Sequence, residues 1–166
     1  MAPGGTTRYL TAYSTEEQAI PAQINPETTD TLLTFSSSSV NTNIHNANLV
    51  DGVLTLPGSH TYLIQTSGIF IDHGGSFHVG DAINLFFRQI SPVDSIVPPG
   101  PLYTFTNTDM ICECNGVHFS YSFEKIIIIP DDSASFAVNA NFTTTSSGGT
   151  ISFSFANKVL NVIQID

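Results

Sequence analysis

The stretch that decides the fold is Val117-His118-Phe119-Ser120-Tyr121-Ser122-Phe123, in which apolar and polar side chains alternate strictly. Successive side chains of a β-strand point to opposite faces, so the apolar members of this stretch share one face. The run Ile126 to Ile129 that follows is wholly apolar, and we expect it to be buried on both faces. The sequence therefore predicts a half-buried strand followed by a fully buried one.

Similar strands recur along the chain and are separated by turn signals. Residues 61–72 alternate, with Tyr62 and Ile64 on one face, and residues 158–165 form an apolar final strand. Asp51-Gly52 and Pro57-Gly58 are typical of tight turns. Roughly eight to ten short strands, spaced by about 8–12 residues, predict an all-β sandwich or closed β architecture. We expect its core to include Phe119, Tyr121, Phe123, Ile151, Phe153, Phe155, Val162 and Ile163.

The chain has 166 residues, a length that suits one domain with one core. Its first 30 residues are the least regular. Ser14 and Glu17 have the spacing of a capping box, which predicts one helical turn at most, and Pro21 and Pro26 keep the chain extended after it. We therefore expect an extended N-terminal arm over residues 1–30 and a single domain over residues 31–166. Such arms often reach neighbouring subunits, and a disordered tail is the alternative.

The charge balance excludes two classes of partner. The formal net charge is −10, from 14 carboxylates against 4 Lys and Arg. So few cations form neither a phosphate-neutralising surface nor a basic patch for an anionic membrane. No apolar run approaches the roughly 20 residues that span a bilayer, and the first residues lack the pattern of a signal peptide. We expect no nucleic-acid binding, no membrane insertion and synthesis in the cytoplasm.

Two cysteines, Cys112 and Cys114, are separated by one residue. In a strand their side chains point to the same face, and a disulfide between such close neighbours is strained. Together with His118 they offer three metal ligands, whereas structural zinc sites take four. We expect two reduced, buried thiols and no cofactor.

No motif of the sequence predicts catalysis. Asp72, His73 and His78 lie close together around two glycines, but the His-x-His pattern of metal-binding jelly rolls is absent. Neither a nucleophile elbow nor a glycine-rich phosphate loop is present. Asp131-Asp132 follows an apolar strand, where we expect a solvated turn rather than paired catalytic carboxylates. We therefore expect that the protein is not an enzyme.

Residues 51–64 resemble the core signature of the C1q/TNF-like family, in which a glycine and an aromatic residue precede a proline-containing turn and a Tyr-any-Phe motif. Gly52, Leu54, Tyr62 and Ile64 stand at the matching positions. Leu54 replaces the family's aromatic residue, and Pro57 falls earlier than the family's proline. Val159 to Ile165 matches the central apolar strand with which family members end. The resemblance extends over residues 31–166, and the similar members are simple viral and bacterial surface proteins without disulfides.

The resemblance implies a ten-strand jelly roll that assembles as a homotrimer, with the last strand and its neighbours lining the threefold axis. The interface, or the core beneath it, would then include Tyr62, Val159, Val162, Ile163 and Ile165 and the 117–123 strand. Single jelly rolls of capsid pentons and minor capsid proteins fit the composition as well.

These observations predict a structural protein of a virion: a capsid, minor capsid, penton or spike component, made in the host cytoplasm. Its partners would be itself and neighbouring structural proteins. The alternative is a C1q-like or lectin-like module that binds protein or glycan through loops at one end of the sandwich. An enzyme on a jelly-roll scaffold is the third hypothesis.

Overall fold

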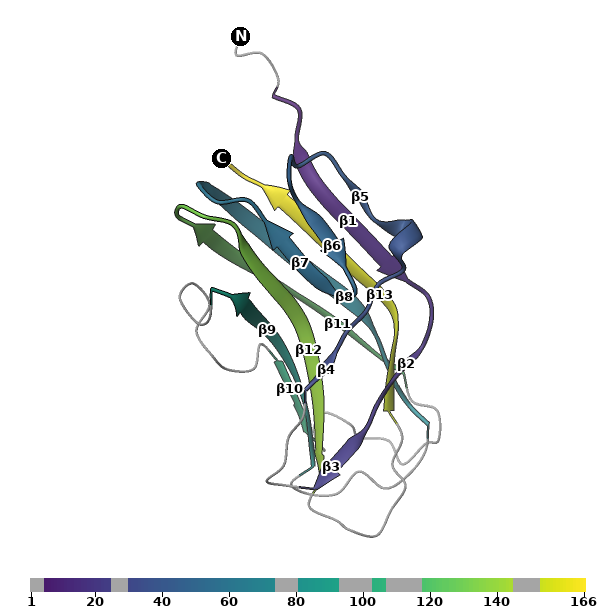
Figure 1. Ribbon diagram of the computed structural model, residues 1–166. Helices are drawn as coiled ribbons and strands as arrows, with labels where there is room; N and C mark the ends of the chain where they lie inside the picture. Colours follow the sequence, from purple (N-terminus) through teal and green to yellow (C-terminus); the bar gives the residue numbers. More distant parts are fainter. Residues whose placement is uncertain (1–4, 25–29, 74–80, 93–102, 107–117, 145–152) are drawn as a thin grey trace.

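A computed structural model describes residues 5–24, 30–73, 81–92, 103–106, 118–144 and 153–166. They form two mainly antiparallel β-sheets that pack face to face (Figure 1). The only helical element among the described residues is a short 3₁₀ turn, Ser37–Ser39. The predicted all-β sandwich of the jelly-roll kind is confirmed.

The six-stranded sheet has the last strand near its middle. Its order is β11 (His118–Ile129), β8 (His60–Asp72), β13 (Phe153–Gln164), β1 (Arg8–Ser14) and β5 (Asn41–Thr42), and β2 (Gln18–Ile20) also pairs with β13. β11 pairs with β8 in register along its whole length of 12 residues. β13 is interrupted by a bulge between Ala156 and Val159, where Asn157 adopts a positive φ of 47°.

The seven-stranded sheet covers the inner face of the first. Its order is β10 (Tyr103–Thr106), β9 (Ala82–Ser91), β12 (Ala134–Thr144), β7 (Val53–Leu56) and β6 (Asn48–Val50), and β3 (Ala22–Ile24) and β4 (Thr31–Leu32) also pair with β12. Asp51 and Gly52 both adopt positive φ between β6 and β7, at 48° and 81°. The predicted hairpin at this dipeptide is confirmed.

The N-terminal segment is extended, as expected, but it is part of the sandwich. β1 pairs with β13 over its full length (Figure 1). Leu10 and Ala12 of β1 are buried in the core. The chain then crosses between the sheets, because β2 pairs with β13 and β3 pairs with β12. The strands of the sandwich therefore begin before residue 31. The helical turn expected from Ser14 to Glu17 is not formed, since Ser14 ends β1.

The core between the sheets is dominated by aromatic rings. Phe153 stacks on Phe70 with ring centroids 4.9 Å apart, and its ring edge meets Phe142 at 4.6 Å. Burial of Phe153 and of its neighbours Tyr121, Phe155 and Val162 is confirmed. Phe123 and Ile163 are only partly buried. The side chains of Phe119 and Ile151 lie outside the described part of the chain.

The prediction for the run Ile126 to Ile129 is wrong. Ile127 and Ile129 are buried, but Ile126 and Ile128 are 61% and 64% exposed. The reason is the position of β11, whose inner face meets the seven-stranded sheet while no other described element covers its outer face. A run of apolar residues in such a strand leaves every second side chain in solvent.

Candidate assembly surface

Apolar side chains form continuous rows on the outer face of the six-stranded sheet. Ile126 of β11 pairs in register with Leu63 of β8, Leu63 with Ile163 of β13, and Ile163 with Tyr9 of β1. In the adjacent row Ile128 pairs with Thr61, whose carbonyl accepts a hydrogen bond from the Ile165 N–H at 3.0 Å. Ile165 is 49% exposed. We call these two rows, Ile126, Leu63, Ile163, Tyr9, Ile128, Thr61 and Ile165, the apolar rows.

The same face becomes polar on the other side of the apolar rows. The next row across the sheet contains Glu124, Gln65, Asn161 and Thr11. Gln65 Nε2 donates a hydrogen bond to Glu124 Oε2 at 3.2 Å. Glu124, Gln65 and Asn161 line a shallow hollow of about 340 Å³, together with Ser67 and Ser122. The outer face thus has an apolar part and a hydroxyl- and amide-rich part.

The edge strand of this sheet, β11, carries a charged side chain on its inner face. Lys125 belongs to the inward-facing set of β11, between Phe123 and Ile127, and is partly buried. An inward-pointing charge on an edge strand opposes the addition of a further strand. Contacts with another molecule are therefore favoured on the face, where Ile126 and Ile128 are exposed, rather than along the edge.

The residues predicted from the resemblance divide between the face and the core. Val159 and Ile163 are partly buried on the outer face, and Ile165 is exposed there. Tyr62 and Val162 have no exposed surface and lie in the core beneath that face. The phenol of Tyr62 donates a hydrogen bond to the Pro57 carbonyl at 3.0 Å. Burial, assisted by the nearby Asp166 carboxylate, raises the pKa of Tyr62 to about 12.

Sequence reasoning missed the members of the apolar rows that lie on other strands. The sequence places Tyr9 in an arm, does not distinguish Leu63 from its neighbours, and predicts burial of Ile126 and Ile128. No local signal marks them as one surface, because register across four strands brings them together. One local signal exists for Leu63: it lies between Tyr62 and Ile64, which are buried, so strand alternation places the Leu63 side chain on the outer face.

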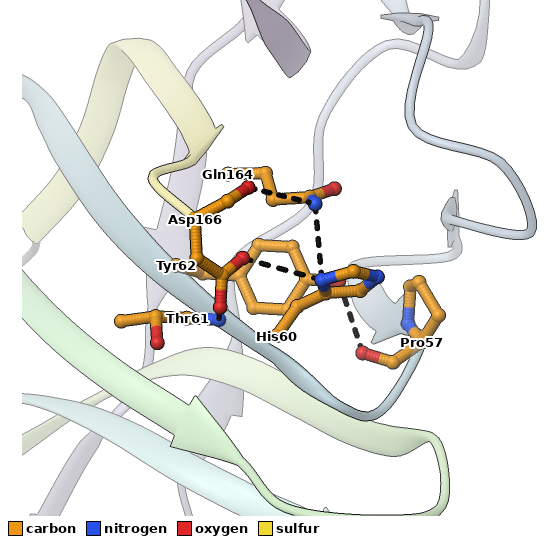
Figure 2. Close-up of polar contacts among 6 residues, drawn as sticks. All are labelled: Pro57, His60, Thr61, Tyr62, Gln164 and Asp166. Atoms are coloured by element: carbon orange, nitrogen blue, oxygen red, sulfur yellow. Dashed lines mark hydrogen bonds and ion pairs between the residues drawn. The ribbon is translucent and has the colours of Figure 1, made fainter.

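A polar cluster lies at the end of β13, next to the apolar rows (Figure 2). The Thr61 N–H donates to Asp166 Oδ2 at 2.8 Å, and Asp166 Oδ1 lies 3.2 Å from His60 Nδ1. Gln164 Nε2 lies 3.0 Å from the same nitrogen of His60. Desolvation opposes ionisation of Asp166, but the hydrogen bonds from Thr61 and His60 outweigh it and lower the pKa of this carboxyl. The cluster borders an open hollow of about 680 Å³ that Arg8 also lines.

A second polar cluster contains a serine, a histidine and a glutamate. His73 Nε2 lies 2.8 Å from Ser154 Oγ and 3.0 Å from Glu17 Oε2, and Ser154 Oγ donates to Glu17 Oε2 at 3.1 Å. A hydrolytic triad needs the histidine between the other two groups, one on each ring nitrogen. Here both groups contact the same nitrogen, and Ser154 is 2% exposed. The arrangement ties β2 and the end of β8 to β13 and does not present a nucleophile.

Lys158 is buried in the middle of β13, beside the bulge, and 1% of its surface is exposed. Its amine donates to the Glu16 carbonyl and to Gln18 Oε1, both at 3.3 Å. Desolvation lowers the pKa of this amine, against the opposing effect of the Glu16 carboxylate. These contacts fasten the connection between β1 and β2 to the last strand.

Five further candidates were predicted from the sequence, and the structure describes two of them. His78, Cys112 and Cys114 lie outside the described residues, and Asp131 and Asp132 are exposed in the turn between β11 and β12. In the described part of the chain, no three His, Cys, Asp or Glu side chains are grouped to hold a metal ion. Nor is any helix there long and apolar enough to cross a membrane. No protein-family model matches the chain, and no curated protein has a similar sequence.

Proposed function

We propose that this protein is a structural component that assembles with copies of itself through the outer face of its six-stranded sheet. The observation that carries the proposal is the apolar rows, in which four strands contribute side chains to one exposed surface. Exposed isoleucines grouped in this way are typical of interaction surfaces. Removing such apolar surface from water favours association.

A second copy of the chain suits this surface. The apolar rows contain no charged side chain, whereas the chain as a whole carries a net charge of −10. Two strongly acidic molecules attract only where their contact is apolar or hydrogen-bonded, and the apolar rows offer such a contact. The central position of β13 supports a homotrimer, because the resemblance implies a threefold axis lined by the last strand and its neighbours.

The resemblance also supports a virion as the setting, with the protein as a capsid, minor capsid, penton or spike component beside other structural proteins. The low content of charged residues, 11%, and the 37 Ser and Thr fit a surface whose contacts are hydroxyl hydrogen bonds rather than ion pairs.

The test is the oligomeric state of the purified protein, measured by sedimentation velocity and mass photometry at micromolar concentration. The wild type should be a trimer, and Ile126→Glu should convert it to a folded monomer. Val50→Glu is the matched control, because Val50 is 59% exposed on β6 of the other sheet. A monomeric wild type at tens of micromolar, or equal disruption by both variants, would contradict the proposal and favour the loop-based C1q-like or lectin-like binding module.

A further inference from the structure

We propose that His60, Gln164 and Asp166 form a proton-operated clasp: protonation of His60 fixes the end of β13 and strengthens self-association through the adjoining apolar rows. The second half of this proposal rests on the proposed function, while the first half concerns the folded chain alone.

The clasp follows from the hydrogen-bonding capacity of one nitrogen atom. His60 Nδ1 has Gln164 Nε2 at 3.0 Å and Asp166 Oδ1 at 3.2 Å (Figure 2). A carboxamide nitrogen only donates and a carboxylate only accepts, so an imidazole nitrogen without a hydrogen accepts from Gln164 and faces Asp166 lone pair to lone pair. The neutral ring can also carry its hydrogen on Nδ1 and donate to Asp166. Protonation places a hydrogen on Nδ1 in every ring and adds a positive charge to this bond.

The buried carboxamide of Gln164 allows the cluster to adapt to this proton. Gln164 Oε1 is buried and has no hydrogen-bond partner among the described residues, while Nε2 also reaches the Asp166 carbonyl at 3.3 Å. Turning the carboxamide over exchanges its oxygen and nitrogen. With Nδ1 protonated, the turned carboxamide oxygen and Asp166 Oδ1 both accept from it, while the bond from Nε2 to the Asp166 carbonyl is given up and the nitrogen takes the buried place of Oε1. The open end of the β8–β13 pair is thereby closed by a charge-assisted hydrogen bond.

The neighbours of His60 on the surrounding described strands include two charged groups close to the ring. The carboxylate of Asp166 follows the end of β13, and the guanidinium of Arg8, on β1, lines the same hollow. Tyr62 of β8 presents its ring edge to His60 at a centroid distance of 6.2 Å. β11 places the uncharged Ile129 opposite His60, and the carboxylates of the turn beyond it, Asp131 and Asp132, are exposed to solvent.

The clasp acts on the apolar rows through its neighbours in the chain. The Asp166 carboxylate accepts a hydrogen bond from the Thr61 N–H, and the Ile165 N–H donates one to the Thr61 carbonyl. Both bonds fix Thr61 of β8 against the end of β13. Closing the clasp holds the exposed Ile165 in place beside Thr61, the residue that pairs with Ile128. Protonation also removes one unit from the negative charge of each copy, which lowers repulsion between copies. Imidazole groups change charge between about pH 5 and 8, so acidification should favour assembly in this range.

The clasp itself is tested by hydrogen exchange at pH 5.5 and pH 8.0, corrected for the intrinsic exchange rates. The measurement uses the Ile126→Glu background, so that assembly does not contribute. The amides of Thr61 and Ile165 should be about two- to fivefold better protected at pH 5.5, the size expected for an exposed ion pair. His60→Asn, which keeps an uncharged donor near the Nδ1 position, should abolish the difference. His45→Asn, at an exposed turn residue between β5 and β6, should retain it. Equal protection at both pH values, or an unchanged difference in His60→Asn, would overturn the clasp.

Its effect on assembly is tested separately by sedimentation velocity at constant ionic strength. The dissociation constant of the wild type and of His45→Asn should be about two- to fivefold lower at pH 5.5 than at pH 8.0. That of His60→Asn should not change with pH. The same pH dependence in His60→Asn would overturn the coupling. A wild type that is monomeric at both pH values would contradict the proposed function and the coupling that rests on it, while the exchange measurement would still decide the clasp.

Discussion

Ile126 and Ile163 are register partners of the same residue, Leu63, from opposite sides of β8. The two isoleucines belong to different strands and are far apart in the sequence, yet one apolar row joins them across the outer face of the sheet. The row exists only once β8 lies between β11 and β13, so it is a property of the folded sheet.

The neighbouring residues Ile126 and Ile127 should respond very differently to truncation. Ile127→Ala should lower the free energy of unfolding by about 2–4 kcal/mol, because it empties a buried site between the sheets. Ile126→Ala should change it by less than about 0.5 kcal/mol, since its side chain is exposed in the single subunit. Urea unfolding of both variants in the Ile128→Ser background, which limits association, measures the difference. Equal losses would show that the two faces of β11 are assigned incorrectly.

Phe153 should be among the costliest residues to truncate. Its ring contacts Phe70 and Phe142 and has no exposed surface, so Phe153→Ala should lower the free energy of unfolding by about 3–5 kcal/mol. Tyr13→Ala is the control, because Tyr13 is 56% exposed on β1. The measurement is again urea unfolding, and a loss below about 1 kcal/mol for Phe153→Ala would contradict the packing of the core.

Lys158 should make the stability of the protein rise with pH in the alkaline range. Its pKa is lowered in the folded state, so above that lowered pKa the unfolded chain binds the proton that the folded chain has released. Stability therefore increases with pH up to the ordinary lysine pKa of 10.5. Lys158→Met should remove this slope below pH 10.5 and leave stability at pH 7 unchanged or higher by up to about 3 kcal/mol. Thermal unfolding across this range tests it, with Lys125→Met as the control; a strongly destabilised Lys158→Met at pH 7 would show that the amine is essential to the fold.

Tyr62 should act in the opposite direction at higher pH. Its pKa is raised from 10 to about 12, so the folded phenol keeps its proton where the unfolded one ionises. The stability it contributes is complete below pH 10 and is lost as pH rises toward 12. Absorbance at about 295 nm should show Tyr62 ionising late, and Tyr62→Phe should flatten the fall in stability. If the stability of Tyr62→Phe fell with pH as steeply as that of the wild type, the loss would come from other tyrosines. Burial also raises the pKa of Tyr121.

The sequence predicts those parts of the fold that depend on neighbouring residues. The hairpin at Asp51-Gly52 requires positive φ at adjacent positions, which this dipeptide tolerates, and the alternation around Phe153 and Phe155 identifies a buried face. The exposure of Ile126 depends on whether a second layer covers β11, and nothing in the run of isoleucines carries that information.

The candidate site was harder to predict for the same reason. Tyr9 joins the apolar rows only through the pairing of β1 with β13, and β13 lies at the other end of the sequence. His60 and Asp166 belong to turn-like, polar surroundings that read as ordinary solvated residues. Only the antiparallel pairing of β8 with β13 brings the start of one strand to the end of the other.

The pairing of β1 with β13 also has a consequence for how the chain acquires its structure. β1 is synthesised long before its principal partner β13, because Phe153–Gln164 follows Arg8–Ser14 at a great distance along the chain. Loop-closure entropy must be overcome across nearly the whole chain before this pairing forms, which makes folding slow relative to proteins with local contacts. Until then the apolar sides of β1 and β8 lack the strand that lies between them. During synthesis the nascent protein therefore exposes apolar surface and unpaired strand edges. Its yield in a cell should depend on temperature and on chaperones that bind such chains.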